Sequence, residues 1–403
     1  MKILQINAVN AIKSTGRTCL EMSNYFNDNG HNCVTAYSMG PSVNAEKEFI
    51  IGTAFDRKAH ALLSRLFGMQ GYFSRSATKN LIAYIKIFSP DVVILRNFHS
   101  NYINLPMVLK FLAKNNISTV VVLHDCWFYT GKCCHYTIAG CYKWKSGCGE
   151  CKSLKKYNKS WFFDFTKKMV KDKEKYFSAI PSLCVVGVSD WLTQEAKAAP
   201  VFKNAKKITR IYNWINLDKF KPTDSEDIRN KLEIQDKKVI LCVSSLWSYD
   251  KGLKTVLKLS EKLSPDERII MLGNLPNKDL LNDNIISLPA TNSIEELVKL
   301  YSLADVFFQP SLEETFGKVS AEALASGTPV VCFNSTANQE LVGKGCGAVV
   351  PVGDIDGLYK EIKEILSKEK SVYTKACREF AEQNFDMKKN LSEYAKLFEE
   401  INS

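Results

Sequence analysis

Two series of short apolar runs, separated by segments with helical spacing, restrict what this chain can fold into. The first series occupies residues 2–9, 33–37, 92–96, 119–124, 182–189 and 208–213. The second occupies residues 238–245, 268–273, 284–289, 305–310, 328–333 and 347–352. Strands that are apolar along their whole length are typical of parallel sheets buried on both faces, with helices as the crossovers. The pattern therefore predicts an α/β fold with two parallel sheets.

A polar stretch between the two series marks the expected domain boundary, and 403 residues are too many for one ordinary domain. We assign residues 1–215 to an N-terminal Rossmann-like domain, 216–237 to a linker and 238–385 to a C-terminal Rossmann-like domain. The last residues, 386–403, have one apolar helical stripe and are expected to cross back to the first domain. Ligands in such sheets bind beyond the carboxyl ends of the strands. We therefore expect the domains to face each other across a central cleft that holds the site.

Composition excludes several other classes of protein. With 45% apolar and 24% charged residues, the chain is neither disordered nor collagen-like nor a coiled coil. No uncharged apolar run approaches the roughly 18–20 residues that span a bilayer, and the N-terminus lacks the pattern of a secretory signal. We therefore expect a cytoplasmic protein. The net charge of +11 favours an anionic partner.

The most informative motif is PSLEETFGKVSAEALASGTPVV, residues 310–331. It contains a strand end, a loop, a helix, a glycine stop and the next strand. Gly317 stands where the helix begins, and a helix N-terminus offers unpaired N–H groups that suit a diphosphate. Glu314 in the loop can accept hydrogen bonds from sugar hydroxyls, and Glu322 on the helix can accept a pair from a ribose diol. Taken singly, each glutamate is more easily explained as a solvated surface residue.

The same run resembles the Glu-x7-Glu signature of retaining glycosyltransferases of family 4, which have the GT-B fold. Residues 14–18 (STGRT) resemble the N-terminal glycine loop of that family, and residues 211–222 resemble its segment at the linker. Residues 243–253 resemble the phosphate-binding turn that opens the C-terminal domain. The block LHDCW…TG…C, beginning at Leu123, is most similar to transferases of bacterial capsule, exopolysaccharide and O-antigen synthesis.

The resemblance implies a role for each matching residue. The donor-binding set would be Gly16, Arg17, Ser245, Lys251, Glu314, Phe316, Gly317, Lys318, Val319 and Glu322. Within this set, Glu322 would bind the ribose, Glu314 the donor sugar and Lys251 the leaving diphosphate. His124 would face the reacting sugar, which makes His124, Glu314 and Lys251 the expected catalytic residues.

Two further points complete the expected site. His99 and Asp125 also follow predicted strands and are possible cleft residues. The family usually has arginine where this chain has Ser245. Either Lys251 carries more of the charge or Arg17 substitutes for the missing cation.

The resemblance implies a retaining glycosyltransferase that moves a sugar from a nucleoside diphosphate, with UDP favoured, to a glycan acceptor in bacterial surface polysaccharide synthesis. Its chemistry would need no catalytic metal or cofactor, because the nucleotide-sugar is itself a substrate. Two alternatives remain open: a sugar-nucleotide epimerase or hydrolase of the same fold, and a non-catalytic nucleotide-sugar-binding scaffold. A dinucleotide oxidoreductase is disfavoured, because the glycine-rich stretch at residues 343–347 lacks the required spacing and precedes a strand.

Six of the 13 cysteines fall in an insert at residues 126–151. Cys133, Cys141, Cys148 and Cys151 have the spacing C-x7-C-x6-C-x2-C, which suits a structural zinc site. The nearby Cys134 and His135 leave the choice of ligands ambiguous. The alternative is a set of free or partly oxidised cysteines in a long loop.

A basic segment at residues 152–177 follows this insert. Between Lys152 and Lys175 it has nine lysines and three acidic residues, interleaved with aromatic residues. This composition suits an anionic membrane surface beside a lipid-linked acceptor, so we expect a peripheral protein at the inner face of the plasma membrane. A solvated charged helix with buried aromatic residues is the alternative. No nucleic-acid-binding module accompanies the lysines, so no nucleic acid partner is expected.

Overall fold

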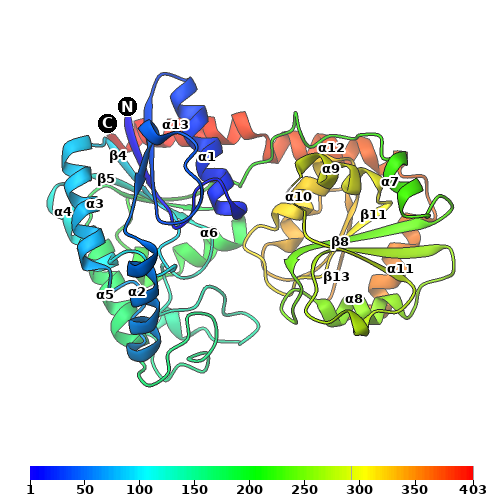
Figure 1. Ribbon diagram of the computed structural model, residues 1–403, viewed down its shortest axis with the longest axis horizontal. Helices are drawn as coiled ribbons and strands as arrows, with labels where there is room; N and C mark the ends of the chain where they lie inside the picture. The colour runs from blue at the N-terminus through cyan, green and yellow to red at the C-terminus, as the bar shows by residue number, and fades with distance from the viewer. Residues whose placement is uncertain (292, 403) are drawn as a thin grey trace. The chain divides into compact units, whose positions relative to one another are not determined.

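The computed structural model describes residues 1–291 and 293–402, and the chain forms two compact units. Unit 1 comprises Met1–Ile211 and Leu391–Ser403, and unit 2 comprises Tyr212–Asn390. Each unit is built on one sheet with helices packed against it (Figure 1). None of the helices in the described ranges has both the length and the apolar character needed to traverse a bilayer.

The sheet of unit 1 has seven strands in the order β3-β2-β1-β4-β5-β6-β7, and all its strand pairs are parallel. The strands are β1 (Lys2–Ile6), β2 (Asn32–Tyr37), β3 (Glu48–Ile50), β4 (Val92–Leu95), β5 (Ser118–Leu123), β6 (Leu183–Gly187) and β7 (Lys207–Arg210). The strand order reverses between β1 and β4. At such a point the loops that follow the two strands diverge and leave room for a ligand.

The helices of unit 1 are α1 (Lys13–Asp28), α2 (Ala54–Phe67), α3 (Arg75–Phe88), α4 (Leu105–Lys114), α5 (Thr166–Phe177) and α6 (Asp190–Lys197). The last helix of the chain, α13 (Met387–Asn402), also packs on this unit. The ring of Phe398 lies 5.3 Å from that of Phe26 on α1, and Ser118 Oγ at the start of β5 donates to the carbonyl of Ile401. The apolar stripe of the tail is therefore part of the core of unit 1.

The sheet of unit 2 has six parallel strands in the order β10-β9-β8-β11-β12-β13. They are β8 (Lys238–Leu246), β9 (Glu267–Asn274), β10 (Ile285–Leu288), β11 (Val306–Gln309), β12 (Val330–Phe333) and β13 (Gly347–Val350). The helices are α7 (Glu226–Lys231), α8 (Leu253–Ser260), α9 (Ile294–Leu303), α10 (Lys318–Ala325), α11 (Ile355–Leu366) and α12 (Ser371–Phe385). Here the strand order reverses between β8 and β11.

The expected α/β architecture with two parallel sheets is confirmed, but some local expectations differ from the structure. Gly16 and Arg17 were expected in a polar turn and instead lie in the first turns of α1. The helix starts earlier because the polar run from Lys13 to Thr18 stays on its exposed side except at Gly16 and Thr18, which are buried. The stretch 216–237 contains α7, which is joined to α9 by an ion pair of 2.8 Å between Asp227 and Lys299.

Candidate sugar-nucleotide site

The loops that follow β8 and β11 leave the same edge of the sheet of unit 2, because the two strands are adjacent and parallel. Lys251 lies in the first loop and Glu314 in the second. Lys251 Nζ and Glu314 Oε1 are 2.5 Å apart. A cation and a carboxylate thus meet at the point where an open α/β sheet is expected to bind its ligand.

Backbone contacts hold these two loops together. Gly252 begins α8 with φ +76°, and a Cβ there would come within 2.1 Å of the carbonyl oxygen of Pro310. The N–H of Leu312 donates to the carbonyl of Asp250 at 3.0 Å. Only glycine permits so close an approach, and this packing places Lys251 beside Glu314.

Helix α10 begins at Lys318, shortly after Glu314 in the chain. Gly317 precedes the helix with φ +84°, and a Cβ there would meet Leu341 Cδ1 at 3.0 Å. Lys318 and Val319 form the first turn and are half-buried, whereas the ring of Phe316 is buried against Tyr212 and Phe385. Phe316 can therefore offer a ligand only its backbone. The N-terminus of α10 gives the site unpaired N–H groups and a partial positive charge.

Glu322 lies one turn further along α10 and is only 4% exposed. Its Oε2 accepts a hydrogen bond of 3.0 Å from the hydroxyl of Tyr301 on α9. Because a carboxyl group has several acceptor sites, this side chain can also accept hydrogen bonds from a sugar diol. Tyr301 was not singled out from the sequence, since a tyrosine in an apolar helix pattern gives no distinctive signal.

Gln309 is a second residue that the sequence did not indicate. It ends β11 and is 1% exposed, and within the described structure its Nε2 has no hydrogen-bond partner. That atom lies 3.7 Å from where a Cβ on Gly317 would stand. A buried unpaired donor beside the start of α10 is suited to a ligand oxygen.

Ser245 lies near the end of β8 and is exposed, so it supplies a hydroxyl where a cation was expected. Lys251 and Lys318 are the cations that the two site loops place in unit 2. Arg17 is exposed on α1 in unit 1, and its suggested substitution for the missing cation remains a prediction.

In unit 1, polar residues follow β4 and β5 at the carboxyl edge of the sheet. His99 Nε2 lies 2.7 Å from Asp125 Oδ2, while Asp125 Oδ1 accepts the N–H of Trp127 at 2.8 Å. Burial alone would lower the pKa of His99, but the neighbouring Cys134 and Asp125 outweigh it and raise this pKa well above its usual value. Burial would likewise raise the pKa of Asp125, and its contacts with His99 lower it. The two side chains thus shift each other's pKa in opposite directions.

His124 directly follows β5 and is held by a buried arginine. Arg96 Nε donates to His124 Nε2 at 3.2 Å. The same guanidinium donates to Gln5 Oε1 on β1 and to Thr18 Oγ1 on α1, both at 2.8 Å. Arg96 is 2% exposed. The sequence places Arg96 at the end of an apolar strand. Its hydrogen bond to His124 was not predicted, because an arginine at a strand end is usually solvated.

Gly16 is the buried member of the N-terminal glycine loop. A Cβ there would stand 3.1–3.2 Å from the backbone of Asn10 and Ala11 and from the side chain of Val9. Ala11 and Lys13 both have positive φ values, 58° and 56°. The loop between β1 and α1 is therefore tight and strained, which is common where backbone must approach a ligand.

The cysteine insert separates into two groups. The Cys133 and Cys151 thiols are hydrogen-bonded to each other, and Cys148 Sγ accepts the N–H of Gly131 at 3.3 Å. The hydrogen bond from Cys133 lowers the pKa of Cys151. Cys134 instead lies beside His99 and Asp125. Cys134 therefore has different neighbours from Cys133 and Cys151, and the choice of zinc ligands stays a prediction.

Across residues 1–291 and 293–402, the set His99, Asp125 and Cys134 is the one group of three potential metal ligands whose donor atoms lie within 4.8 Å of one another. Cys133, Cys141, Cys148 and Cys151 are not drawn together to that extent. The ion pair between His99 and Asp125 already satisfies that group in part.

Two lysines near the insert are buried and hold it in place. Lys132 Nζ donates to the carbonyls of Ser153, Leu154 and Lys156. Lys173, fully buried on α5, donates to the carbonyls of Trp127 and Thr130 and lies 3.6 Å from the centre of the Trp127 ring. Burial lowers the pKa of Lys173 to about 7. The basic segment is thus not wholly a surface feature, since one of its nine lysines is structural.

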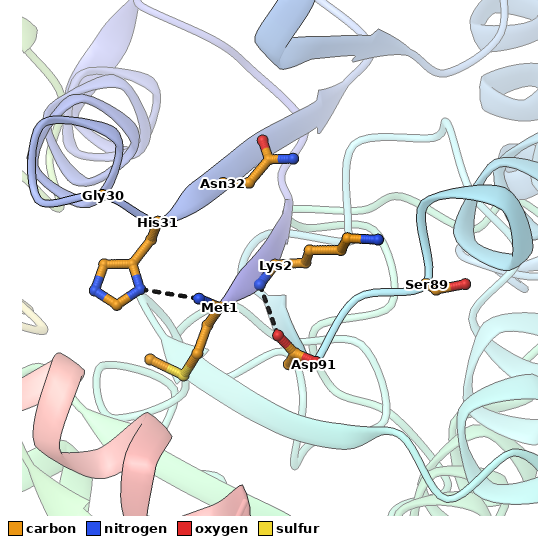
Figure 2. Close-up of a pocket in the computed structure, with 7 residues that line it drawn as sticks. All are labelled: Met1, Lys2, Gly30, His31, Asn32, Ser89 and Asp91. Atoms are coloured by element: carbon orange, nitrogen blue, oxygen red, sulfur yellow. Dashed lines mark hydrogen bonds between the residues drawn. The ribbon is translucent and has the colours of Figure 1, made fainter.

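A hollow of about 410 Å³ lies at the opposite edge of the sheet of unit 1 (Figure 2). It is lined by residues at or just before the starts of β1, β2 and β4, among them Met1, Asn32 and Asp91. The amino group of Met1 contacts His31 Nδ1 at 3.2 Å, and the N–H of Lys2 donates to Asp91 at 2.7 Å. Because ligands of such sheets bind at the carboxyl ends of strands, this hollow is not the substrate site.

The fold and the two loop sites define a class of two-domain glycosyltransferases. A family description, Glycosyltransferase Family 4, matches residues 15–219, and a second, Glycosyl transferases group 1, matches residues 224–387. The chain belongs to glycosyltransferase family 4.

Curated relatives are distant. An uncharacterized glycosyltransferase of Methanocaldococcus jannaschii is 30% identical over 183 residues, and D-inositol 3-phosphate glycosyltransferase of Mycolicibacterium smegmatis is 29% identical over 193 residues. The two matches cover 41% and 44% of this chain, respectively. They cover 46% and 44% of the two relatives, so this chain spans less than half the length of each. A putative colanic acid biosynthesis glycosyl transferase of Escherichia coli is 24% identical over 77% of each chain.

Solved structures share the fold over nearly the whole chain. Sucrose-phosphate synthase from Thermosynechococcus elongatus superposes with a TM-score of 0.71 at 16% identity, covering 99% of this chain and 98% of the other. Anabaena HepE, solved in complex with UDP-glucose, superposes with a TM-score of 0.66 at 15% identity, covering 99% and 100%. These likenesses confirm the expected GT-B architecture.

Proposed function

We propose that this glycosyltransferase moves a sugar from a UDP-sugar to a lipid-linked glycan acceptor at the inner face of the plasma membrane, in bacterial surface polysaccharide synthesis. The observation that carries the donor half is the Lys251–Glu314 pair beside the N-terminus of α10. Anabaena HepE with UDP-glucose supports the choice of donor, and the E. coli relative supports the polysaccharide context.

The donor would lie along the loops of unit 2. The diphosphate would take hydrogen bonds from the first N–H groups of α10 and the charge of Lys251. Glu322, buried beside Tyr301, would accept the ribose hydroxyls, and Glu314 would contact the sugar. Phosphate binding would draw Lys251 away from Glu314. Lys251 would then contact the diphosphate, and Glu314 would be able to contact the sugar.

The reaction would break the bond between the sugar and the diphosphate. Negative charge then develops on the leaving phosphate, and preorganised cations and N–H groups stabilise it. We propose transfer with retention at the anomeric carbon, in which the leaving phosphate takes the acceptor proton, without a protein nucleophile or a catalytic metal. His124, on unit 1, would face the sugar, and His99 and Asp125 would contact the acceptor side.

We also propose that Cys133, Cys141, Cys148 and Cys151 bind a structural zinc ion. Four thiols from one loop fit zinc, Cys133 and Cys151 are already in contact, and the adjacent Lys132 ammonium offsets thiolate charge. Such an ion would brace the loop after His124. Metal analysis should find about one equivalent of zinc per chain. Folded protein that contains no bound zinc would contradict this assignment.

A transfer assay tests the proposed function. The purified protein is incubated with UDP-sugars, lipid-linked glycans and EDTA, and the configuration of the new bond is read by proton NMR. We expect a product with the configuration of the donor. Lys251→Met should lower kcat about a hundredfold through lost stabilisation of the leaving group, whereas Lys254→Met, an exposed neighbour on α8, should not.

Other outcomes favour the alternatives. Consumption of donor without an acceptor would indicate a hydrolase or an epimerase. Binding of nucleotide without any turnover would indicate a scaffold protein.

A further inference from the structure

Helix α2 exposes an apolar and basic stripe, although its inward side also carries the half-buried Leu63 and Leu66. Phe55, Lys58, Leu62 and Arg65 share its exposed stripe at helical spacing, and Phe55 and Leu62 are 79% and 50% exposed. The buried face carries His60 and Ser64. A surface helix normally turns its apolar stripe to the core. The outward face of α2 is therefore built for an environment other than water.

A loop of unit 1 extends this apolar surface. Trp161, Phe162 and Phe163 are 47%, 69% and 47% exposed. The Phe163 ring stacks on that of Phe67 at the end of α2, with centroids 6.2 Å apart and planes 13° apart. The N–H of Trp161 donates to the carbonyl of Arg65 at 2.7 Å. We call the six exposed apolar residues the α2 patch: Phe55, Leu62, Phe67, Trp161, Phe162 and Phe163.

The surroundings of the α2 patch are strongly basic. Lys58 and Arg65 interrupt it on the helix, and eight of the nine lysines between Lys152 and Lys175 are exposed. The acidic residues nearby are engaged elsewhere: Asp164 accepts the N–H groups of Cys151 and Thr166, and Asp172 accepts the hydroxyl of Tyr72. Aromatic residues framed by lysines match the boundary between acyl chains and anionic headgroups.

The α2 patch lies next to the carboxyl edge of the sheet of unit 1. Gln70, just beyond α2, donates to the carbonyl of His99. A Cβ on Gly71 would meet the Trp127 ring at 3.0 Å, so this turn packs directly on the loop after β5. The same turn contacts α5, where Asp172 accepts a hydrogen bond from the hydroxyl of Tyr72. A molecule anchored at the patch would hold its headgroup near His99 and Asp125.

We propose that the α2 patch docks the protein on an anionic bilayer, with its aromatic side chains in the headgroup boundary and its lysines on lipid phosphates. This inference rests on the proposed lipid-linked acceptor and names the surface that meets the membrane carrying it. A second copy of the chain is a poorer occupant, because two such patches would bring like charges together.

The test is sedimentation with vesicles of phosphatidylglycerol and phosphatidylcholine, compared with phosphatidylcholine alone. We expect binding only to the anionic vesicles, weakened by salt. Phe55→Ser with Leu62→Ser, and separately Trp161→Ala with Phe162→Ala, should weaken it at least tenfold. Lys58→Glu with Arg65→Glu should weaken it further, since each basic residue contributes about fivefold.

A matched control carries Val372→Ser and Lys375→Glu, an exposed apolar and basic pair on α12 of unit 2. It should bind vesicles like the unmodified protein. Binding unchanged by the α2 variants, or reduced equally by the control, would overturn the proposal. So would loss of a dimer, without loss of vesicle binding, in the α2 variants.

Nucleotide binding separates this inference from the proposed function. Variants of the α2 patch should keep the affinity for UDP, because none of the expected donor-binding residues belongs to the patch. A protein that binds vesicles but no nucleotide would retain the docking surface and lose the proposed donor. A protein that binds UDP but no vesicles would retain the proposed donor and lose the docking surface.

Discussion

At the scale of single residues, hydrogen bonds from buried donors orient the side chains of the candidate site. Arg96 Nε donates to His124 Nε2, so that nitrogen accepts and the imidazole proton stands on Nδ1. The buried guanidinium therefore orients the imidazole ring of His124. Tyr301 similarly orients Glu322 by donating its hydroxyl proton to Oε2.

Gly317 is the residue whose backbone the donor site depends on most. Gly317→Ala should lower the affinity for UDP at least tenfold, because alanine at φ +84° costs about 1–2 kcal/mol and its Cβ would press on Leu341. Calorimetric titration with UDP measures the change. Gly353→Ala is the matched control, since Gly353 has φ +86° and nothing within 4 Å of a Cβ. Equal losses in both variants would contradict a special role for Gly317.

At the scale of elements, the sequence predicted the strands better than the helices. The buried strands are apolar throughout, so their pattern is unambiguous, and the motif around Gly317 placed α10 with its N-terminus at the site. The outward stripe of α2 was not predicted, because its apolar residues lie on both sides of the helix and the sequence alone does not show that Phe55 and Leu62 face outward. The positions of Lys173 and Cys134 depend on contacts distant in sequence, and local pattern does not contain them.

The buried face of α2 makes unit 1 sensitive to acid. Burial lowers the pKa of His60 from 6.5 to about 4, while its Nδ1 bonds Ser74 and its Nε2 accepts the N–H of Gly71. Because the folded pKa lies below the unfolded one, this stabilisation is complete above pH 6.5 and is lost as pH falls toward 4. The loss should reach about 3 kcal/mol.

Urea unfolding at several pH values measures this dependence, with His60→Gln as the comparison. Glutamine can make similar hydrogen bonds but does not titrate, so the variant should lose less stability between pH 6.5 and pH 4. Parallel curves for the two proteins would show that other groups cause the acid sensitivity.

At the scale of the whole molecule, the end of the chain completes the unit that begins it. Phe398 on α13 packs on Phe26, and both side chains are fully buried. Phe398→Ala should therefore lower the free energy of unfolding of unit 1 by about 3–4 kcal/mol. Urea unfolding followed by circular dichroism measures it. Lys388→Ala, exposed on the same helix, should have little effect, and equal effects would contradict this packing.

The central claim is that unit 2 binds a nucleoside diphosphate at the loops after β8 and β11. Thermal unfolding with UDP, GDP and other nucleoside diphosphates, free of metal, tests it most directly beside Glu322→Gln and the exposed control Glu364→Gln. UDP at a hundred times its Kd should stabilise the protein by about 2.7 kcal/mol, and Glu322→Gln alone should lose that gain. No shift with any nucleotide in folded protein, or an equal shift in the Glu322→Gln variant, would contradict the proposed donor site.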